Sequence, residues 1–248
     1  MTLPKLTGGG DYDILLVVGA KKIGMSKVTK NAKKFNLPEE KLLGDWIVCI
    51  PGFTLEKYRR LQRSHLSIFS VNCFGNILLH SLGLPFNSPL GNIGFYEGNY
   101  FKFLNSPREY MKKIPTFKEQ KIDSKTGQKR NFVNLGDIWL SIMHYETFED
   151  FIAMWEKRKP RINWDNLFIE THAYNEKALE LFDALPYDKK VCFVPFKSNL
   201  DSAFYIDPST QDEPNFTTML INYAFGKIFY YDVFDMLLYG KKTPLIDM

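Results

Sequence analysis

The chain has 248 residues, 45% of them hydrophobic and 24% charged, so it can bury one substantial core or two small ones. Its formal charge of +4 is too small to indicate nucleic acid as a partner. We expect a cytoplasmic protein, because the sequence has only three cysteines, no signal peptide and no apolar run of membrane-spanning length.

The first 64 residues are predicted to form a small N-terminal βαβ-like lobe, with the main α/β domain over residues 65–248. Residues 12–18 form an apolar run typical of a buried strand, and residues 19–24 follow it as a glycine-containing turn. This resembles the opening of a nucleotide-binding βαβ unit, but Lys21 stands where the middle glycine is usual. A plain strand-to-helix turn is the alternative.

A strand-to-helix junction around Cys73 is the best place in the sequence to look for chemistry. Residues 66–71 form an apolar run that predicts a covered strand, and apolar spacing predicts a helix from Phe74. Cys73 would then face the unpaired N–H groups of a helix N-terminus, which favour the reactive thiolate. Asn72 and Gly75 suit a tight turn beside it.

A basic β-hairpin is predicted over residues 117–133, with Gly127 in its turn. Seven basic residues and two acidic residues lie between Lys112 and Arg130. Lys121, Lys125 and Lys129 could therefore bind an anionic substrate, or they could belong to a solvated arm. The loop before the hairpin, residues 85–99, contains Ser88 and would line whatever Cys73 faces.

Two further strands place histidines at their ends. Residues 138–143 predict a strand followed by His144 and Tyr145, and residues 167–170 predict another followed by His172. Between them, residues 148–157 predict a helix. The cations after that helix complement the helix dipole or bind an anion. The candidate anion-binding residues here are Arg158, Arg161 and Asn163.

The alternation of strands and helices predicts an α/β fold with a mainly parallel sheet and helices on both faces, in Rossmann- or flavodoxin-like layers. The basic hairpin is an insertion in that plan. Residues 215–239 are dense in aromatics and predict a C-terminal helical tail. That tail would pack on the sheet or on a second copy, which makes a homo-oligomer an expectation.

Three segments resemble motifs of a bacterial family known as a domain of unknown function, number nineteen-nineteen. They are SIFSVNCFGN, LGLPFNSP and LGDIWLSIMHYETFEDFIAMWEKRKPRINWDNLF, which together span residues 67–168. The resemblance implies a role in polysaccharide biosynthesis, because members are often encoded among capsule and exopolysaccharide genes. Some members are labelled acyltransferases, so the resemblance also implies acyl transfer.

Acyl transfer is the sharpest hypothesis that the residues themselves allow. Ligands bind beyond the carboxyl ends of parallel strands, so Cys73, His144 and His172 should gather at one sheet edge. A cysteine beside an imidazole can take an acetyl group from acetyl-CoA as a thioester and pass it to a sugar hydroxyl. His144 is the favoured base and His172 the reserve, with the N–H groups of Phe74 and Gly75 stabilising the oxyanion.

Other readings of the same residues stay open. Cys73 could be a small buried residue. The basic clusters could serve a glycosyl or sugar-phosphate transferase, or a non-catalytic binding or assembly protein for an anionic polysaccharide. The expected ligand is an anionic saccharide or a CoA-type molecule, and no metal-binding motif occurs. The candidate ligand-binding residues are Asn72, Gly75, Ser88, Tyr145, Arg158, Arg161, Asn163, Lys121, Lys125 and Lys129.

Overall fold

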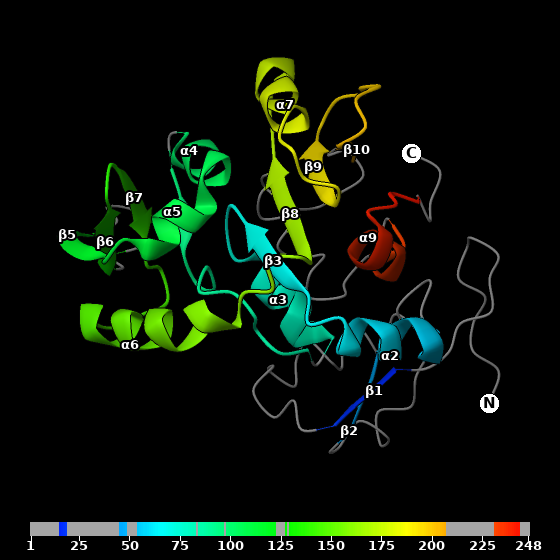
Figure 1. The fold of residues 1–248 in the computed structure, drawn as a ribbon, viewed down its shortest axis with the longest axis horizontal. Helices are drawn as coiled ribbons and strands as arrows, with labels where there is room; N and C mark the ends of the chain where they lie inside the picture. Colours follow the sequence, from blue (N-terminus) through cyan, green and yellow to red (C-terminus); the bar gives the residue numbers. More distant parts are fainter. Residues whose placement is uncertain are drawn as a thin grey trace. The chain divides into compact units, whose positions relative to one another are not determined.

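A computed structural model describes residues 15–18, 45–48, 54–82, 84–96, 98–122, 127, 129–206 and 231–243 (Figure 1). The chain divides into two compact units. The first comprises Met1–His65, Ile77–Pro85 and Ile206–Met248, and the second comprises Leu66–Asn76 and Phe86–Tyr205. Most of the N-terminal lobe proposed for residues 1–64 lies outside the described residues, so its boundary stays a prediction.

The first unit contains a small antiparallel sheet. Strand β1 (Leu15–Val18) pairs antiparallel with β2 (Asp45–Val48), whereas a βαβ unit would have parallel strands. The glycine-containing turn predicted at residues 19–24 lies outside the described residues. Helix α2 (Leu55–Arg63) begins after Thr54, whose side chain accepts a hydrogen bond from the Lys57 N–H at 3.1 Å.

An ion-pair group joins α2 to α9 (Val233–Tyr239) within the first unit. The Lys57 ammonium lies 2.8 Å from Asp232 and 2.7 Å from Asp235. Helix α9 ends at Gly240, whose φ of 69° is the left-handed conformation that glycine adopts readily, as the sequence predicts. Residues 215–230 of the aromatic tail lie outside the described residues, so oligomerisation through the tail stays a prediction.

The second unit contains a parallel sheet of four strands in the order β10-β9-β8-β3. The strands are β3 (Ser67–Ser70), β8 (Leu167–His172), β9 (Lys190–Val194) and β10 (Ala203–Tyr205). All three pairings are parallel, and α7 (Glu176–Asp183) connects β8 to β9. Ser70 lies directly opposite Glu170, so both side chains share one face of the sheet.

A second sheet of four strands in this unit is antiparallel, with the order β4-β7-β6-β5. Its strands are β4 (Gly94–Phe95), β5 (Thr116–Ile122), β6 (Lys129–Leu135) and β7 (Ile138–Ser141). The predicted hairpin is confirmed as β5 and β6. The fold is α/β as predicted, but one mainly parallel, Rossmann-like sheet is wrong, because β7 belongs to the antiparallel sheet.

The reason for this correction lies in the turn between β6 and β7. Only Gly136 and Asp137 separate the two strands, and a connection of two residues can join only antiparallel neighbours. Gly136 has a φ of 68°, which hairpin turns of this length require. An apolar run such as residues 138–143 predicts a buried strand but carries no information about its direction.

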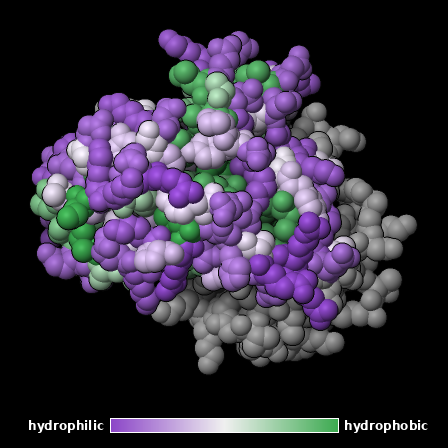
Figure 2. Space-filling view, viewed as in Figure 1, coloured by the Kyte–Doolittle hydropathy of each residue, from purple (hydrophilic) through white to green (hydrophobic). Residues whose placement is uncertain are grey.

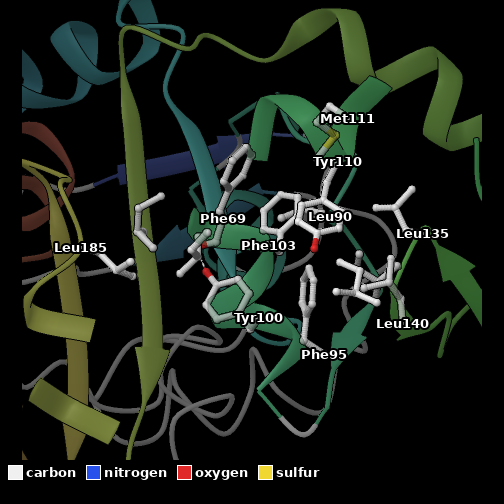
Figure 3. Packing of buried hydrophobic residues seen from close by; sticks show 14 of the residues in the cluster. Phe69, Leu90, Phe95, Tyr100, Phe103, Tyr110, Met111, Leu135, Leu140 and Leu185 are labelled. Carbon is white, nitrogen blue, oxygen red and sulfur yellow. Dashed lines mark hydrogen bonds between the residues drawn. The ribbon is translucent and has the colours of Figure 1, made fainter. Parts of the chain in front are cut away.

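An aromatic core fills the second unit (Figure 3). The Phe69 and Phe103 ring centroids are 5.5 Å apart, and those of Phe95 and Tyr100 are 4.8 Å apart. The Tyr100 hydroxyl lies 2.8 Å from the Phe69 carbonyl oxygen and 3.0 Å from that of Glu170, which ties helix α4 (Asn99–Asn105) to two neighbouring strands. Each fully buried aromatic ring contributes about 1.5–3 kcal/mol. This core thus accommodates part of the high aromatic content of the chain.

Five further helices belong to the described structure. They are α3 (Phe74–Ser81), α4 (Asn99–Asn105), α5 (Pro107–Lys112), α6 (Phe148–Arg158) and the 3-10 helix η2 (Lys159–Arg161). Among the residues that the structure describes, no helix is both long and apolar enough to cross a membrane. Hydrophobic side chains reach the visible surface in small separate patches among hydrophilic ones (Figure 2).

Candidate functional site

Aromatic rings and cations gather on the solvent side of the antiparallel sheet, which we call the outer face. Residues directly opposite each other in neighbouring strands point to the same side. The register therefore puts Phe132 and Glu119 together, Arg130 and Lys121 together, and Trp139 on that same side. The other side of the sheet carries Val133 and Leu140, both fully buried in the core. We define the outer face by Tyr96, Lys118, Lys121, Arg130, Phe132 and Trp139.

The three rings of the outer face form one packed group. Tyr96 and Trp139 are stacked, with ring centroids 5.2 Å apart and an angle of 11° between their planes. Phe132 contacts Trp139 edge to face at 5.5 Å, a geometry that aromatic quadrupoles favour. Tyr96 and Trp139 are half-buried and Phe132 is buried, so this group is rigid at its base and reaches solvent at its edges.

Each cation of the outer face contacts one of these rings. The Lys118 ammonium lies 4.4 Å from the Trp139 centroid, and the Lys121 ammonium lies 5.5 Å from that of Phe132. An Arg130 guanidinium nitrogen lies 3.4 Å from the Tyr96 hydroxyl. Cations within about 6 Å of a ring are attracted to its negative face. The rings of Trp139 and Phe132 therefore help to hold the Lys118 and Lys121 ammonium groups in place.

The acidic counterpart on this face is Glu119. Its carboxylate lies 3.1 Å from the Lys121 ammonium and 3.9 Å from the Lys118 ammonium. Among the described residues of this face, Lys118 and Lys121 share this one carboxylate, which leaves their group with a net positive charge. This arrangement can bind an anion, and the exposed lysine side chains can adapt to it.

The junction at Cys73 forms as predicted, between β3 and α3, but burial reverses the expected effect on the thiol. The side chain is only 5% exposed, and burial raises the pKa of the Cys73 thiol to about 11. The expected oxyanion donors are already engaged, since the Phe74 N–H donates to Asn72 Oδ1 at 2.9 Å and the Gly75 N–H donates to Ser70 Oγ at 3.0 Å. Desolvation thus outweighs the helix terminus here.

The structure does not bring either candidate imidazole into hydrogen-bond contact with Cys73. His144 follows β7, which lies in the antiparallel sheet, so the shared carboxyl edge on which its placement depended does not exist. The side chain of His144 is exposed. His172 ends β8 in the parallel sheet, and burial lowers the pKa of its imidazole to about 4. The catalytic pairing of Cys73 with a histidine therefore stays a prediction.

Tyr145 and Arg158 are predicted residues that do lie together, and Tyr145 interacts electrostatically with Cys73. The Tyr145 hydroxyl donates to the Gly91 carbonyl at 3.0 Å, and an Arg158 nitrogen lies 3.4 Å from that hydroxyl. Burial raises the pKa of Tyr145, while the Arg158 charge lowers it and Cys73 adds a small rise. A Cβ on Gly91 would stand 2.7 Å from Arg158, so the loop backbone is packed against the guanidinium.

Of the remaining predicted ligand-binding residues, some form hydrogen bonds within the fold and others lie on the surface. Ser88 is buried and accepts a hydrogen bond from the Leu90 N–H at 3.1 Å. The Asn163 N–H donates to Ser67 Oγ at 2.9 Å, and its side-chain oxygen accepts from the Asp165 N–H at 3.2 Å. Arg161 is exposed on η2. Lys129 begins β6, and Lys125 lies outside the described residues.

Sequence reasoning found the basic hairpin but missed the aromatic residues beneath it. The signal was present, because Arg130 and Phe132 alternate with the buried Asn131 and Val133 at the period of two that marks one face of a strand. In the described ranges, no three His, Cys, Asp or Glu side chains converge in a way that could hold a metal ion.

Comparison with known proteins gives two matches. The sequence profile of the family described as Domain of unknown function (DUF1919) matches residues 48–239. A protein of Haemophilus influenzae (strain ATCC 51907 / DSM 11121 / KW20 / Rd), described as "Uncharacterized protein", is 31% identical over 153 residues. That alignment covers 60% of this chain and 71% of the relative.

Proposed function

The chain belongs to the DUF1919 family, and from the chemistry of its outer face we propose that it binds an acidic polysaccharide. The observation that supports this function is the packing of Lys118 and Lys121 against the rings of Trp139 and Phe132. Beside them, Arg130 donates a hydrogen bond to the Tyr96 hydroxyl. The cations would pair with carboxylate or phosphate groups of the polymer. The half-buried ring edges would contact the apolar C–H surfaces of its sugar units.

A polymer is the ligand that fits the shape of this site. The cations lie along a sheet face that is built from neighbouring strands, so their charges are spread out and do not converge on a single anion. A chain with regularly spaced negative charges can pair with several of them at once. The capsule and exopolysaccharide setting that the family resemblance implies would supply such a polymer.

A binding titration with polygalacturonate, a polyuronic acid, tests the proposal directly. We expect calorimetric binding that weakens as salt is added, because exposed charges are screened. The triple variant Lys118→Ala, Lys121→Ala, Arg130→Ala should bind at least about tenfold more weakly, since three exposed ion pairs together supply about 1–3 kcal/mol. The matched control replaces Lys157, Lys177 and Lys197 with Ala, because all three are exposed cations of the same unit and none belongs to the outer face.

Two results would overturn the proposal. One is unchanged polygalacturonate binding by the triple variant, with neutral dextran binding equally well. The other is tighter binding of single-stranded poly-uridylate than of polygalacturonate, which would assign the face to nucleic acid, since stacked rings and cations also suit that ligand. Thermal unfolding of the triple variant confirms that its fold is intact.

Acyl transfer from acetyl-CoA to a sugar hydroxyl remains a separate hypothesis. It needs a base near the Cys73 sulfur, and Tyr145 is the predicted site residue whose hydroxyl interacts electrostatically with Cys73. Incubation with acetyl-CoA followed by intact mass measurement tests it. An acetyl adduct that disappears in Cys73→Ala would support the hypothesis, and the absence of any adduct would count against it. Glycosyl transfer is tested in the same way by calorimetry with nucleotide sugars.

A further inference from the structure

A pocket of about 460 Å³ opens at the amino ends of β8 and β9, within the second unit. This is the end of the parallel sheet opposite to the one that Cys73 follows, and the pocket shares no residue with the outer face. Its volume falls in the range of about 300–1,000 Å³ that is common for small-molecule sites. Its lining includes Arg108, Trp164, Asp165, Tyr187, Asp188 and Lys189.

The aromatic side chains of the pocket wall are held in place by contacts with the residues that surround them. The Trp164 ring meets Phe69 of the core at 6.0 Å, with their planes at 83°. The Arg108 guanidinium lies 4.4 Å from the Trp164 centroid. The Tyr187 hydroxyl donates to the Leu104 carbonyl at 2.6 Å. The wall is therefore preformed, and a stacked guanidinium still presents its N–H groups at its edge.

The charges of the lining nearly balance. Arg108 and Lys189 are the cations, and Asp165 and Asp188 face them as carboxylates. Glu109 also lines the pocket, but its carboxylate lies 2.7 Å from the Lys112 ammonium. Burial lowers the pKa of Lys189, and the nearby Asp188 opposes that effect. A ligand for this pocket must therefore supply hydrogen-bond donors and acceptors in equal measure.

We propose that this pocket binds one neutral pyranose sugar. Each sugar hydroxyl both donates and accepts, so neighbouring hydroxyls can donate to Asp165 and Asp188 and accept from Arg108 and Lys189. The C–H face of the ring is apolar and matches the stacked layer of Trp164 and Arg108. A polyanion is disfavoured by the two carboxylates. The pocket is thus chemically distinct from the outer face, and this inference does not depend on the function proposed above.

Saturation-transfer NMR with methyl glycosides of glucose, galactose, mannose and N-acetylglucosamine tests this inference on the full chain. We expect at least one of them to bind, with its signals reduced in Arg108→Ala and in Asp165→Asn. Each variant should weaken binding by about tenfold or more, the factor for losing a hydrogen bond to a charged group. Both side chains are exposed, so these variants should keep the fold. Arg59→Ala is the control.

Three outcomes would overturn the inference. The first is that no methyl glycoside binds the wild-type protein. The second is that binding survives in both Arg108→Ala and Asp165→Asn, which would place the sugar elsewhere. The third is that glycine, a zwitterion with separate charges for the cations and carboxylates, binds and displaces the sugar. Polygalacturonate binding by Arg108→Ala should equal that of the wild type. This measurement distinguishes a failure of the sugar-pocket inference from a failure of the function proposed for the outer face.

Discussion

At the turn before α3 the polar groups bond to one another, whereas on the outer face they project into solvent. The Asn72 and Ser70 side chains accept hydrogen bonds from the Phe74 and Gly75 N–H groups, and Cys73 is buried beside them. On the outer face, Lys118 and Lys121 lie over aromatic rings and stay exposed. Polar groups that bond to one another build a scaffold, and those held by rings remain able to bind a partner.

The largest expected effect is the loss of stability in Gly75→Ala. A Cβ at residue 75 would lie 2.4 Å from Ser70 Oγ and 2.6 Å from an Ile68 methyl carbon, so β3 and α3 would have to separate. We expect the free energy of unfolding to fall by about 3 kcal/mol or more, measured by denaturant titration. In the control Gly94→Ala, the nearest atom is the flexible Met143 methyl at 3.3 Å, so a much smaller loss is expected. Equal losses would contradict this account of the turn.

Glu170 gives the interior of the parallel sheet a pH dependence. The residue is fully buried, both carboxylate oxygens have no hydrogen-bond partner in the described part of the chain, and burial raises its pKa from 4.5 to about 8. The folded state therefore keeps a proton that the unfolded state releases. Stability is full below pH 4.5 and is lost as the pH rises towards 8.

Replacing Glu170 with Gln should remove this loss of stability. At pH 8 we expect Glu170→Gln to be more stable than the wild type by about 3 kcal/mol, and at pH 4 to differ little. Urea titrations at several pH values measure the change, and the exposed Glu180→Gln is the control. A wild-type stability that stays flat between pH 5 and pH 8 would show that the carboxyl has a partner.

The reactivity of Cys73 provides a third way to distinguish the two regions. With its pKa raised to about 11 by burial, the thiol should react with iodoacetamide about 100-fold more slowly in the folded protein than in guanidinium. Peptide mass spectrometry at pH 7 follows the labelling of residue 73. A cysteine introduced by Lys177→Cys on the exposed side of α7 is the control. If both thiols react at the same rate, Cys73 is accessible and the acyl-transfer hypothesis gains support.

The sequence predicted local structure well because its signals are local. The helix predicted over residues 148–157 forms as α6, and Thr147 caps it by accepting a hydrogen bond from the Asp150 N–H at 3.1 Å. The junction at Cys73 and the hairpin also depend on neighbouring residues. The direction of β7 depends instead on its partner β6, and the pattern of one strand does not contain it. His144 was misplaced for that reason alone.

The sequence leaves the burial of Cys73 open, with a small buried residue as one alternative, and the 5% exposure of this residue confirms that alternative. A thiol at a helix N-terminus is activated only where solvent or a cation stabilises the thiolate, and burial depends on elements far away in the sequence. The outer face shows the reverse case. Its lysines were visible as a charge excess, but their role depends on Tyr96 and Trp139, which come from separate strands and loops.

The smallest expected effect concerns how firmly the rings hold their cations. In Lys118→Met the aliphatic stem is kept and the ammonium over Trp139 is lost. We expect the free energy of unfolding to fall by about 0.5–1 kcal/mol, the usual value of an exposed cation–π contact. Lys177→Met, on the surface of α7, is the matched control and should change stability less. If the two variants are equally stable, Trp139 does not fix Lys118, and the cations bind polygalacturonate only as mobile charges. The affinity of the protein for polygalacturonate should then depend on the number of cations, and Trp139→Leu should not change that affinity.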